Sequence, residues 1–404
     1  MKIGIAGPLA TVDIAHLLKE KSGPVSEMPG STLVVTLIEE LIAHGHQVAA
    51  FTTEPSLAPK RNNIVVAYGD GLSVYYVPRR RRGFWFDRGC RGRMVDLFKL
   101  EREALVEAIH RAAPDIVHAH WTYEFGWAAQ DSGVPCLITC HDAPWTIFRL
   151  TRDLYRAGRL LMAHRVLRHA RHLTAVSPYL LDELSKFTAA PIEIVPNPLQ
   201  NKLLALGRTR KHTDFEHRPA RVIMIVSGWS KIKNAAIGMT ALAELKKKLP
   251  DMEINLVGSG FGVGEIAEKW ALGRGVNRYF NFRGRLPYVE TQRLLGQSDI
   301  LVHTSLEESF GMTVAEAMAF GVPVVAGERS GAIPWVTGDG QAGLLVDVCS
   351  AEAVADAVKQ LLDRPGLYAR CSASGRTRAQ QVFSQEAVAE AYLLEYRRIL
   401  GEYR

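Results

Sequence analysis

Cysteine is scarce in this sequence: the 404 residues include five, scattered as Cys90, Cys136, Cys140, Cys349 and Cys371. An odd and dispersed set does not form the disulfide framework of a small secreted protein. Cys136 and Cys140 lie close together, but no second pair completes a zinc-binding set. We therefore expect reduced thiols and no structural metal.

Long apolar segments are lacking as well, since no run reaches the roughly 18 residues that are needed to cross a bilayer. The first residues, 1–7, are too short and too rich in glycine for a signal peptide, and they are typical of a first buried strand. The hydrophobic and charged fractions, 47% and 23%, are those of a soluble globular protein. We expect a cytoplasmic location.

What the sequence has instead is an alternation of short apolar runs with helical patterns. In the first half, the runs that predict strands are 3–6, 47–52, 72–77, 115–119, 136–139, 173–176 and 192–195. Strands that alternate with helices form a parallel, doubly wound α/β sheet. A second sheet begins at 221–228, after a polar and basic segment, 202–220, that we interpret as an interdomain linker. At roughly 100–200 residues per domain, the length predicts two or three domains.

The most informative stretch is Ser305–Val325, with the sequence SLEESFGMTVAEAMAFGVPVV. The apolar run before it, 299–303, predicts a buried strand. Met312–Phe320 predicts a helix that ends at Gly321 and Pro323. The polar loop between them therefore lies at the carboxyl end of a strand, which is where open α/β sheets bind ligands.

The loop and helix suit a nucleotide sugar. The start of a helix presents unpaired N–H groups and the positive end of the helix dipole to a phosphate, and Gly311 lets a ligand approach the backbone closely. Glu316, just over one turn into the helix, can accept hydrogen bonds from sugar hydroxyls, and Glu308 can reach another part of the same ligand. Such an arrangement matches a molecule with hydroxyls at both ends and phosphates in the middle.

This stretch resembles the signature of the retaining glycosyltransferases of family 4. The resemblance is carried by Glu308-x7-Glu316 with Phe310-Gly311, Ala317-Met318-Ala319, Gly321 and Pro323-Val324-Val325. It implies the GT-B fold, in which two Rossmann-like domains face each other across a cleft. It also implies an acceptor-side domain over 1–203, a nucleotide-sugar-binding domain over 204–383, and a C-terminal helix, 384–404, that packs back on the first domain.

The resemblance assigns donor contacts residue by residue. Glu316 is expected to hold the ribose, Glu308 the sugar hydroxyls and Lys233 the diphosphate. Glu308 and Lys233 are thereby also expected to be catalytic. Further contacts are expected from Gly228, from Gly258 and from the loop and first helical turn, Ser309, Phe310, Gly311, Met312 and Thr313.

One loop departs from the family pattern. Family members carry an arginine just after the glycine that corresponds to Gly228, whereas this chain has Trp229. Two cations normally neutralise the donor diphosphate and stabilise the leaving group. We expect Lys231 or Arg285 to supply the missing charge beside Lys233.

Histidines end two predicted strands in the first half. Strand periodicity places His118 and His120 on one face; no third ligand for a metal is evident, and a structural role is the alternative. The string resembles the family's histidine motif, in which a histidine lies close to the transferred sugar, and His120 matches it by position. His141-Asp142 resembles an element that lines the cleft. Gly30, at a helix entry, is expected to contact acceptor or donor, or to be a turn residue.

Two arginine-rich stretches, Arg79–Arg93 and Arg149–Arg171, interleave cations with aromatic and aliphatic residues. Such a composition is typical of docking on an anionic membrane surface, and it equally suits an acidic acceptor such as a lipid pyrophosphate. A solvated basic face is the structural alternative. No motif for reading nucleic acid accompanies the charge, so we expect no nucleic-acid partner.

Together these features predict a retaining transferase that moves a hexose-type sugar from a nucleotide diphosphate sugar to a carbohydrate or lipid-linked acceptor, in the synthesis of a cell-surface glycan, glycolipid or polysaccharide. We expect no cofactor and no metal requirement, because side chains and the helix start neutralise the diphosphate. Two alternatives stay open: a nucleotide-sugar epimerase on the same fold, and a catalytically impaired relative, which Trp229 favours.

Overall fold

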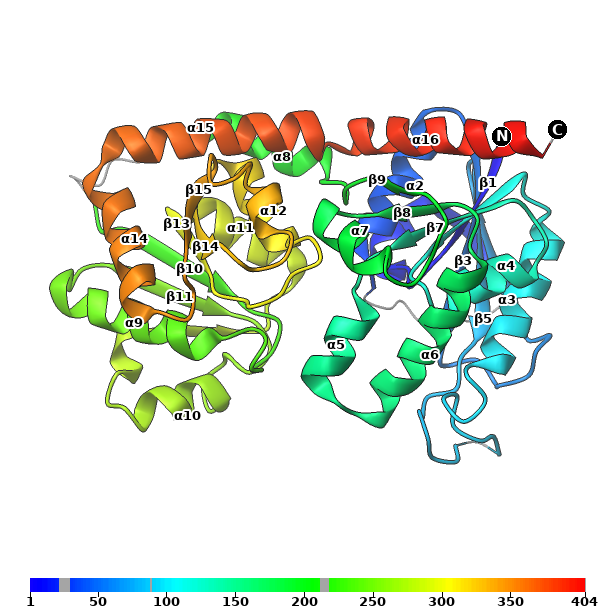
Figure 1. Ribbon diagram of the computed structural model, residues 1–404, viewed down its shortest axis with the longest axis horizontal. Helices are drawn as coiled ribbons and strands as arrows, with labels where there is room; N and C mark the ends of the chain where they lie inside the picture. The colour runs from blue at the N-terminus through cyan, green and yellow to red at the C-terminus, as the bar shows by residue number, and fades with distance from the viewer. Residues whose placement is uncertain (22–29, 88, 211–217, 404) are drawn as a thin grey trace. The chain divides into compact units, whose positions relative to one another are not determined.

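The computed structural model describes residues 1–21, 30–87, 89–210 and 218–403. Its contacts divide the chain into two compact units (Figure 1). The N-terminal unit comprises Met1–Pro198 and Gln385–Arg404, and the C-terminal unit comprises Leu199–Ser384. The sequence analysis placed the division after residue 203; the structure places it after residue 198.

The N-terminal unit contains a nine-stranded sheet. All neighbouring strands are parallel except β4, which is antiparallel to both β2 and β5. In sheet order the strands are β2 (Leu18–Lys21), β4 (Val65–Gly69), β5 (Leu72–Pro78), β3 (Gln47–Glu54), β1 (Lys2–Ala6), β6 (Ile116–His120), β7 (Cys136–Cys140), β8 (Leu173–Ala175) and β9 (Ile192–Ile194).

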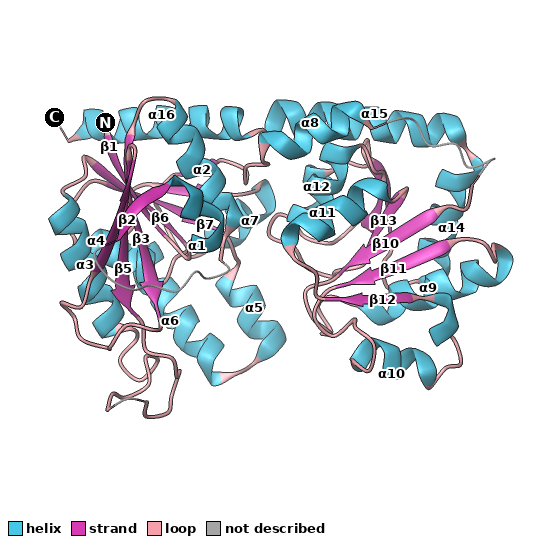
Figure 2. Ribbon diagram, turned by 180° about the vertical axis from the view of Figure 1, so that it is seen from behind, coloured by secondary structure: helices cyan, strands magenta, loops and turns pink. Residues whose placement is uncertain are grey.

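Helices cover both faces of this sheet (Figure 2). On one face, side chains of α2 and α16 share a buried apolar cluster with Ile3 and Ile5 of β1. The other face carries α3, α4 and α6. The helices of the unit are α1 (Thr11–Ile14), α2 (Thr32–Ala43), α3 (Lys99–Ala112), α4 (Glu124–Asp131), α5 (Pro144–Thr151), α6 (Leu154–His169), α7 (Pro178–Leu184) and α16 (Gln385–Glu402).

The C-terminal unit contains a six-stranded, fully parallel sheet. Its order is β12 (Asn281–Gly284), β11 (Glu253–Val257), β10 (Arg221–Ile225), β13 (Ile300–His303), β14 (Val324–Gly327) and β15 (Gly343–Val346). The helices are α8 (Asn201–Thr209), α9 (Ala235–Lys248), α10 (Ile266–Leu272), α11 (Tyr288–Gln297), α12 (Met312–Phe320), α13 (Ile333–Val336), α14 (Ala351–Asp363) and α15 (Pro365–Val382). The prediction of two doubly wound α/β units is confirmed.

The expected linker over 202–220 is wrong in its first part. Residues Asn201–Thr209 form helix α8, which buries Leu203 and Leu204 and packs against α12. The sequence analysis missed this helix because its apolar face is short and the flanking residues are basic. Residues 211–217 of the expected linker lie outside the described part of the chain.

Gly207 marks the point where α8 approaches α12 most closely. A Cβ atom built on Gly207 would lie 1.8 Å from the carbonyl oxygen of Ala319, so the two backbones must separate to admit any side chain. We expect Gly207→Ala to lower the free energy of unfolding by about 1–3 kcal/mol, which is the usual cost of overpacking. Thermal unfolding measures the effect.

A matched control is Gly366→Ala in α15, where the nearest atom to an added Cβ is 4.0 Å away. This exposed helical position should tolerate alanine or gain stability from its higher helix propensity. Equal melting temperatures for Gly207→Ala and the unmodified chain would contradict the close packing of α8 on α12.

Candidate active site

The order of strands in the C-terminal unit reverses between β10 and β13, which are neighbours in the sheet. Ligands of open α/β sheets bind at such a reversal, because the loops after the two strands leave toward opposite sides. Here the two loops are joined directly: the N–H of Leu306 donates to the carbonyl of Ile232 (2.7 Å), and the hydroxyl of Thr304 donates to the carbonyl of Asn234 (3.1 Å). The topology therefore brings two sequence-distant polar loops to one place.

At this place Lys233, Glu308 and His303 form a charged cluster. The Nζ atom of Lys233 donates to Oε1 of Glu308 at 2.6 Å, and Nε2 of His303 lies 3.4 Å from the same oxygen. Burial alone would raise the pKa of Glu308, but the hydrogen bonds and charges of His303 and Lys233 lower it to about 2. Glu308 is therefore a carboxylate at neutral pH, in contact with the lysine that was predicted to bind the diphosphate.

The start of α12 follows this cluster. Gly311 adopts φ 95°, a left-handed conformation that favours glycine, and a Cβ there would lie 2.5 Å from Cδ1 of Ile333. The preceding Phe310 is buried and its ring packs against those of Trp335 and Phe383, at 6.3 and 5.3 Å between centroids. The backbone of the predicted donor contacts Ser309–Thr313 is thus held by a glycine turn and an aromatic anchor.

Glu316 is buried one turn into α12 and faces α11. Its Oε1 accepts a hydrogen bond from the hydroxyl of Tyr288 (2.9 Å), and its Oε2 accepts one from the amide of Gln292 (2.8 Å). Burial raises the pKa of Glu316, although both hydrogen bonds act in the opposite direction. Each carboxylate oxygen can accept further hydrogen bonds, so α11 orients this side chain without saturating it.

The loop after β10 replaces the family arginine by an aromatic contact. Trp229 packs against Phe261 and Trp270, with ring centroids 5.7 and 5.9 Å apart. Lys231 and Arg285 are exposed, and within the described residues neither forms an ion pair. Position 229 therefore supplies no cation to this loop, and whether Lys231 or Arg285 replaces it stays a prediction.

Two of the predicted donor glycines, Gly228 and Gly258, have distinct surroundings. Gly228 adopts φ 88° and has open space where a Cβ would lie. Gly258 adopts φ 134°, and a Cβ there would lie 1.8 Å from the carbonyl oxygen of Val226, so this turn packs directly on the end of β10. Gly258 is needed for backbone packing whether or not a ligand contacts it.

In the N-terminal unit the strand order reverses between β1 and β6, and His120 ends β6. His120 is buried, and its Nδ1 lies 2.9 Å from Nε2 of His141, which follows β7. A Cβ on Gly7, after β1, would lie 3.3 Å from Cβ of His120. The structure thus brings together His120 and His141 at one edge of this sheet, a contact that the sequence analysis did not predict.

A third histidine, His118, lies behind this pair. The rings of His118 and His120 are 4.2 Å apart, and His118 hydrogen-bonds the hydroxyls of Tyr396 (2.7 Å) and Thr139 (2.6 Å). Burial lowers the pKa of His118 and of His141 to about 3, and it lowers that of His120 as well. All three imidazoles are therefore neutral at pH 7, which suits hydrogen bonding rather than charge pairing.

Asp142 and Gly30, the other predicted cleft residues, have clear structural contacts. Asp142 accepts a hydrogen bond from the hydroxyl of Tyr123 (2.8 Å), and burial raises its pKa against the effects of Tyr123 and Arg159. Gly30 lies against Leu9, since a Cβ on Gly30 would be 2.3 Å from the carbonyl oxygen of Leu9. This close approach accounts for a glycine at position 30 without a ligand.

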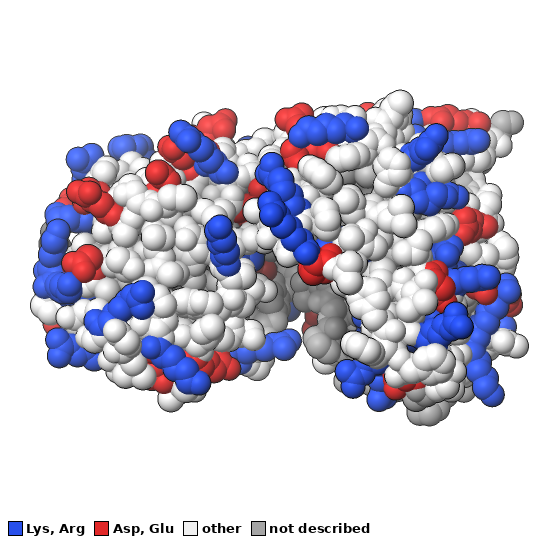
Figure 3. Space-filling model, turned by 60° about the horizontal axis from the view of Figure 1, so that its bottom comes forward, with Lys and Arg blue, Asp and Glu red and all other residues white. Residues whose placement is uncertain are grey.

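The two basic stretches, Arg79–Arg93 and Arg149–Arg171, contain both buried and exposed arginines. Arg80 is buried and pairs with Glu101 (2.6 Å) and Asp96 (2.7 Å), and Arg159 pairs with Glu124. These arginines hold the fold and are not available to a partner, contrary to the expectation for the stretches as a whole. Arginine and lysine side chains that do reach the surface are spread over the visible face of the N-terminal unit, with acidic side chains among them (Figure 3). The exposed members of the two stretches are Arg81, Arg82, Arg91, Arg149, Arg152, Arg168 and Arg171.

Sequence reasoning missed three residues of these sites: His303, Tyr288 and Gln292. His303 ends a predicted buried strand, and its position there was the available signal. Tyr288 and Gln292 lie one turn apart on α11, but their contact with Glu316 arises from the packing of α11 on α12, which no sequence spacing reveals.

The described residues contain no group of three or more His, Cys, Asp or Glu side chains placed to hold a metal ion. None of the helices in the described ranges is both long and apolar enough to cross a membrane.

Comparison with known proteins gives matches to two family models. The model described as Glycosyl transferases group 1 matches residues 208–378, and the model described as Glycosyltransferase Family 4 matches residues 30–200. The MMP alpha-(1->4)-mannosyltransferase of Mycolicibacterium hassiacum is 30% identical over 319 residues, which is 74% of each chain. The D-inositol 3-phosphate glycosyltransferase of Corynebacterium diphtheriae is 25% identical over 384 residues, covering 88% of this chain and 86% of that protein.

A solved structure shares the fold of the whole chain. HepE from Anabaena, in complex with UDP, superposes with a TM-score of 0.68 at 16% identity, covering 98% of this chain and all of that one. At this identity the likeness establishes the fold, which is the two-domain α/β architecture named GT-B. The predicted fold class is confirmed.

The buried histidines predict how stability depends on pH. In the unfolded chain a histidine has a pKa near 6.5, whereas in the folded chain that of His118 and His141 is about 3. Between these values the unfolded state binds more protons, so the free energy of unfolding should fall as the pH drops below 6.5. The slope is up to about 1.4 kcal/mol per pH unit for each such histidine. Urea unfolding at pH 7.5, 6.5 and 5.5 measures it.

His141→Gln should reduce this slope, because one of the buried imidazoles is removed. His164→Gln, at an exposed position of α6, serves as the control and should leave the slope unchanged. Identical slopes for His141→Gln and the unmodified chain would contradict a neutral, buried His141.

Proposed function

The chain belongs to the glycosyltransferases of group 1, family 4, and is therefore a sugar transferase; we propose that it moves a hexose-type sugar from a nucleotide diphosphate sugar to an acceptor hydroxyl with retention of configuration. The observation that carries this proposal is the cluster of Lys233, Glu308 and His303 beside the start of α12. It places a cation, a carboxylate and free helix N–H groups at the sheet reversal where a nucleotide is expected. The UDP in the HepE complex belongs to that protein, and it supports a nucleotide donor for this one.

Each group of the cluster has a proposed role toward the donor. Lys233, with Lys231 or Arg285, binds the diphosphate; Glu308 accepts hydrogen bonds from the sugar hydroxyls. Glu316, oriented by Tyr288 and Gln292, accepts hydrogen bonds from the ribose. Lys233 and Glu308 already form an ion pair without a ligand. The donor is therefore expected to bind this preformed pair, with its diphosphate at Lys233 and its sugar at Glu308.

The proposed step breaks the bond between the anomeric carbon and the diphosphate oxygen and forms a bond from the acceptor oxygen to that carbon on the same face. The proton of the acceptor hydroxyl passes to the departing phosphate oxygen. Lys233 and the start of α12 stabilise the charge that develops on this phosphate, which is the usual role of such groups. We propose that these charges replace a divalent metal, so that activity should survive a chelator.

The acceptor is proposed to bind the N-terminal unit, with His120 near the anomeric carbon. The neutral His120–His141 pair offers a hydrogen-bonding edge, since Nε2 of His120 is buried and has no hydrogen-bond partner within the described residues. The names of the two relatives describe a mannosyltransferase and a D-inositol 3-phosphate glycosyltransferase. A hydroxylated acceptor, carbohydrate or lipid-linked, in the synthesis of a glycan, glycolipid or polysaccharide of the cell surface fits this pattern.

Lys233→Ala tests the donor site. We expect the substitution to lower kcat/KM for the nucleotide sugar by about 100- to 1000-fold, because the main cation at the leaving group is lost. A panel of nucleoside diphosphate sugars, assayed with and without a chelator, measures it and identifies the donor. Lys247→Ala is the matched control: Lys247 is paired with Glu244 at 2.8 Å as Lys233 is paired with Glu308, but on the exposed side of α9. A Lys233→Ala variant with undiminished activity would remove the proposed role.

The exposed part of the basic stretches is proposed to contact an anionic membrane surface. Trp85 and Phe86 are 76% and 71% exposed, beside Arg81 and Arg82. Their loop packs on α6, since a Cβ on Gly83 would lie 3.5 Å from the ring of Tyr155. Cations beside exposed aromatic rings are the composition of peripheral membrane binding, which would place a lipid-linked acceptor near the N-terminal unit.

Trp85→Ser with Phe86→Ser tests the membrane contact. The unmodified chain should sediment with vesicles that contain phosphatidylglycerol and not with neutral vesicles. The double variant should bind the phosphatidylglycerol vesicles more weakly, by a factor of about 10 or more. Val263→Ser, at an equally exposed apolar residue of the C-terminal unit, is the control. Equal binding to both kinds of vesicle, or to neither, would remove the membrane proposal and leave the transfer reaction untouched.

A further inference from the structure

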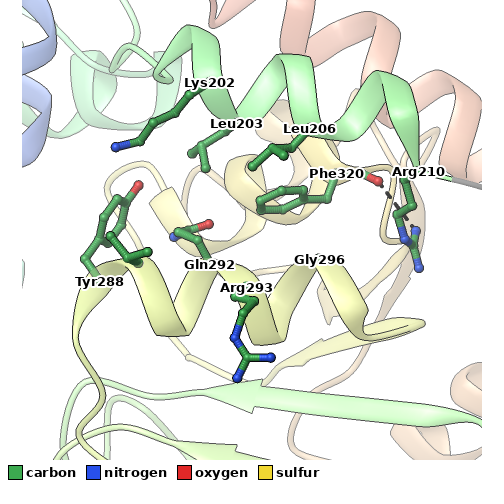
Figure 4. A pocket seen from close by; sticks show the side chains of 10 residues that line it. Lys202, Leu203, Leu206, Arg210, Tyr288, Gln292, Arg293, Gly296 and Phe320 are labelled. Atoms are coloured by element: carbon green, nitrogen blue, oxygen red, sulfur yellow. Dashed lines mark hydrogen bonds between the residues drawn. The ribbon is translucent and has the colours of Figure 1, made fainter.

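A cavity of about 520 Å³ lies within the C-terminal unit, and the proposed transfer does not use it. It opens between α8, α11 and the end of α12 (Figure 4). Its walls are mostly apolar and are formed by Leu203, Leu206, Val289, Gly296 and Phe320. A volume of a few hundred cubic ångströms with apolar walls and a few polar groups is typical of a small-molecule site.

One polar side chain in this cavity is incompletely satisfied. Gln292 is only 5% exposed, and its amide nitrogen donates to Glu316. Its Oε1 is buried and has no hydrogen-bond partner within the described residues. Figure 4 shows the side chain of Gln292 rising from α11 toward α8, with its oxygen on the side of Leu206 and Phe320. A buried acceptor of this kind calls for a donor, because almost all such groups in folded proteins are paired.

The charges around the cavity are cationic. Arg210 lies 3.7 Å from Asp299, and Arg293 pairs with Glu290 at 3.0 Å, so both are offset by carboxylates. Lys202 forms no ion pair within the described residues, and no carboxylate lines the cavity. One end of an otherwise apolar cavity therefore carries an unbalanced positive charge.

We propose that this cavity binds a single-chain anionic amphiphile that carries a hydroxyl group. The chain lies against Leu206 and Phe320, the anionic head pairs with Lys202, and the hydroxyl donates to Oε1 of Gln292. Each of the three features of the cavity is then matched by one feature of the ligand. An uncharged hydrocarbon would leave both Lys202 and Gln292 without partners, and a free phosphate would leave the apolar walls empty.

Occupancy is expected to affect donor binding. Gln292 and Tyr288 line the cavity, and both donate hydrogen bonds to Glu316. A ligand that engages Gln292 changes how firmly Glu316 is held, and by linkage the donor then changes the affinity of the cavity by the same factor. This coupling rests on the proposed role of Glu316, whereas the binding site itself does not.

Calorimetric titration of the full chain with 3-hydroxydecanoate, without nucleotide, tests the site. We expect saturable one-to-one binding, with decanoate and methyl 3-hydroxydecanoate each binding about 5- to 10-fold more weakly, since each loses one polar contact. Leu206→Gln should weaken binding by a factor of about 10 or more, because it places an amide in the apolar wall. Leu206 is 56% exposed, so the variant is expected to fold.

The matched control is Leu272→Gln on α10, at a leucine that is 53% exposed and does not line the cavity. It should bind 3-hydroxydecanoate as the unmodified chain does. Absence of saturable binding, or equal binding by Leu206→Gln and Leu272→Gln, would overturn the proposal. Self-association that depends on Leu206 and that 3-hydroxydecanoate does not disrupt would overturn it too, by showing that a second copy covers the cavity.

A second titration separates the site from its coupling. The affinity for UDP is measured with and without saturating 3-hydroxydecanoate, in the unmodified chain and in Leu206→Gln. The coupling is supported if 3-hydroxydecanoate changes the UDP affinity of the unmodified chain and leaves that of Leu206→Gln unchanged. Unchanged UDP affinity despite bound amphiphile removes the coupling alone, and the result of Lys233→Ala shows independently whether the transfer proposal holds.

Discussion

The contact between Lys233 and Glu308 is the interaction on which the proposed donor site depends. It joins a loop after β10 to a loop after β13, and both side chains are largely enclosed, so each charge needs the other. Removal of either partner would leave a poorly solvated charge at the point where the strand order reverses. The pair thus fixes the relative position of two loops that are 75 residues apart in sequence, before any ligand arrives.

Two tryptophans, Trp229 and Trp335, make the loops around this pair more apolar. At position 229 the ring packs with Phe261 and Trp270, and at position 335 it packs with Phe310 and Phe383. The family has a cation at the first position. Apolar contacts stabilise both loops here, so the proposed diphosphate contacts are left to Lys233, the start of α12 and the exposed Lys231 or Arg285.

Much of this architecture could be predicted from the sequence, and the failures have physical causes. Helix α12 was predicted with its observed ends because a left-handed glycine bounds it on each side, Gly311 at φ 95° and Gly321 at φ 67°. Helix α8 was missed because nine residues with a short apolar face give little periodic signal. The partners of Glu316 on α11 were missed for a different reason: they are fixed by how two helices pack, and a single sequence carries no record of that contact.

The last helix shows how far such long-range contacts reach. Tyr396 and Tyr392 of α16 hydrogen-bond His118 and Thr139, on β6 and β7, and these lie directly behind His120. Without α16, His118 would lose a buried hydrogen bond and the apolar face of α2 would lose its cover, since both elements share one core. Residues 1–198 are therefore not a complete domain. The N-terminal unit needs α16 to complete the packing around His118 and His120. That helix nevertheless follows the whole C-terminal unit in sequence.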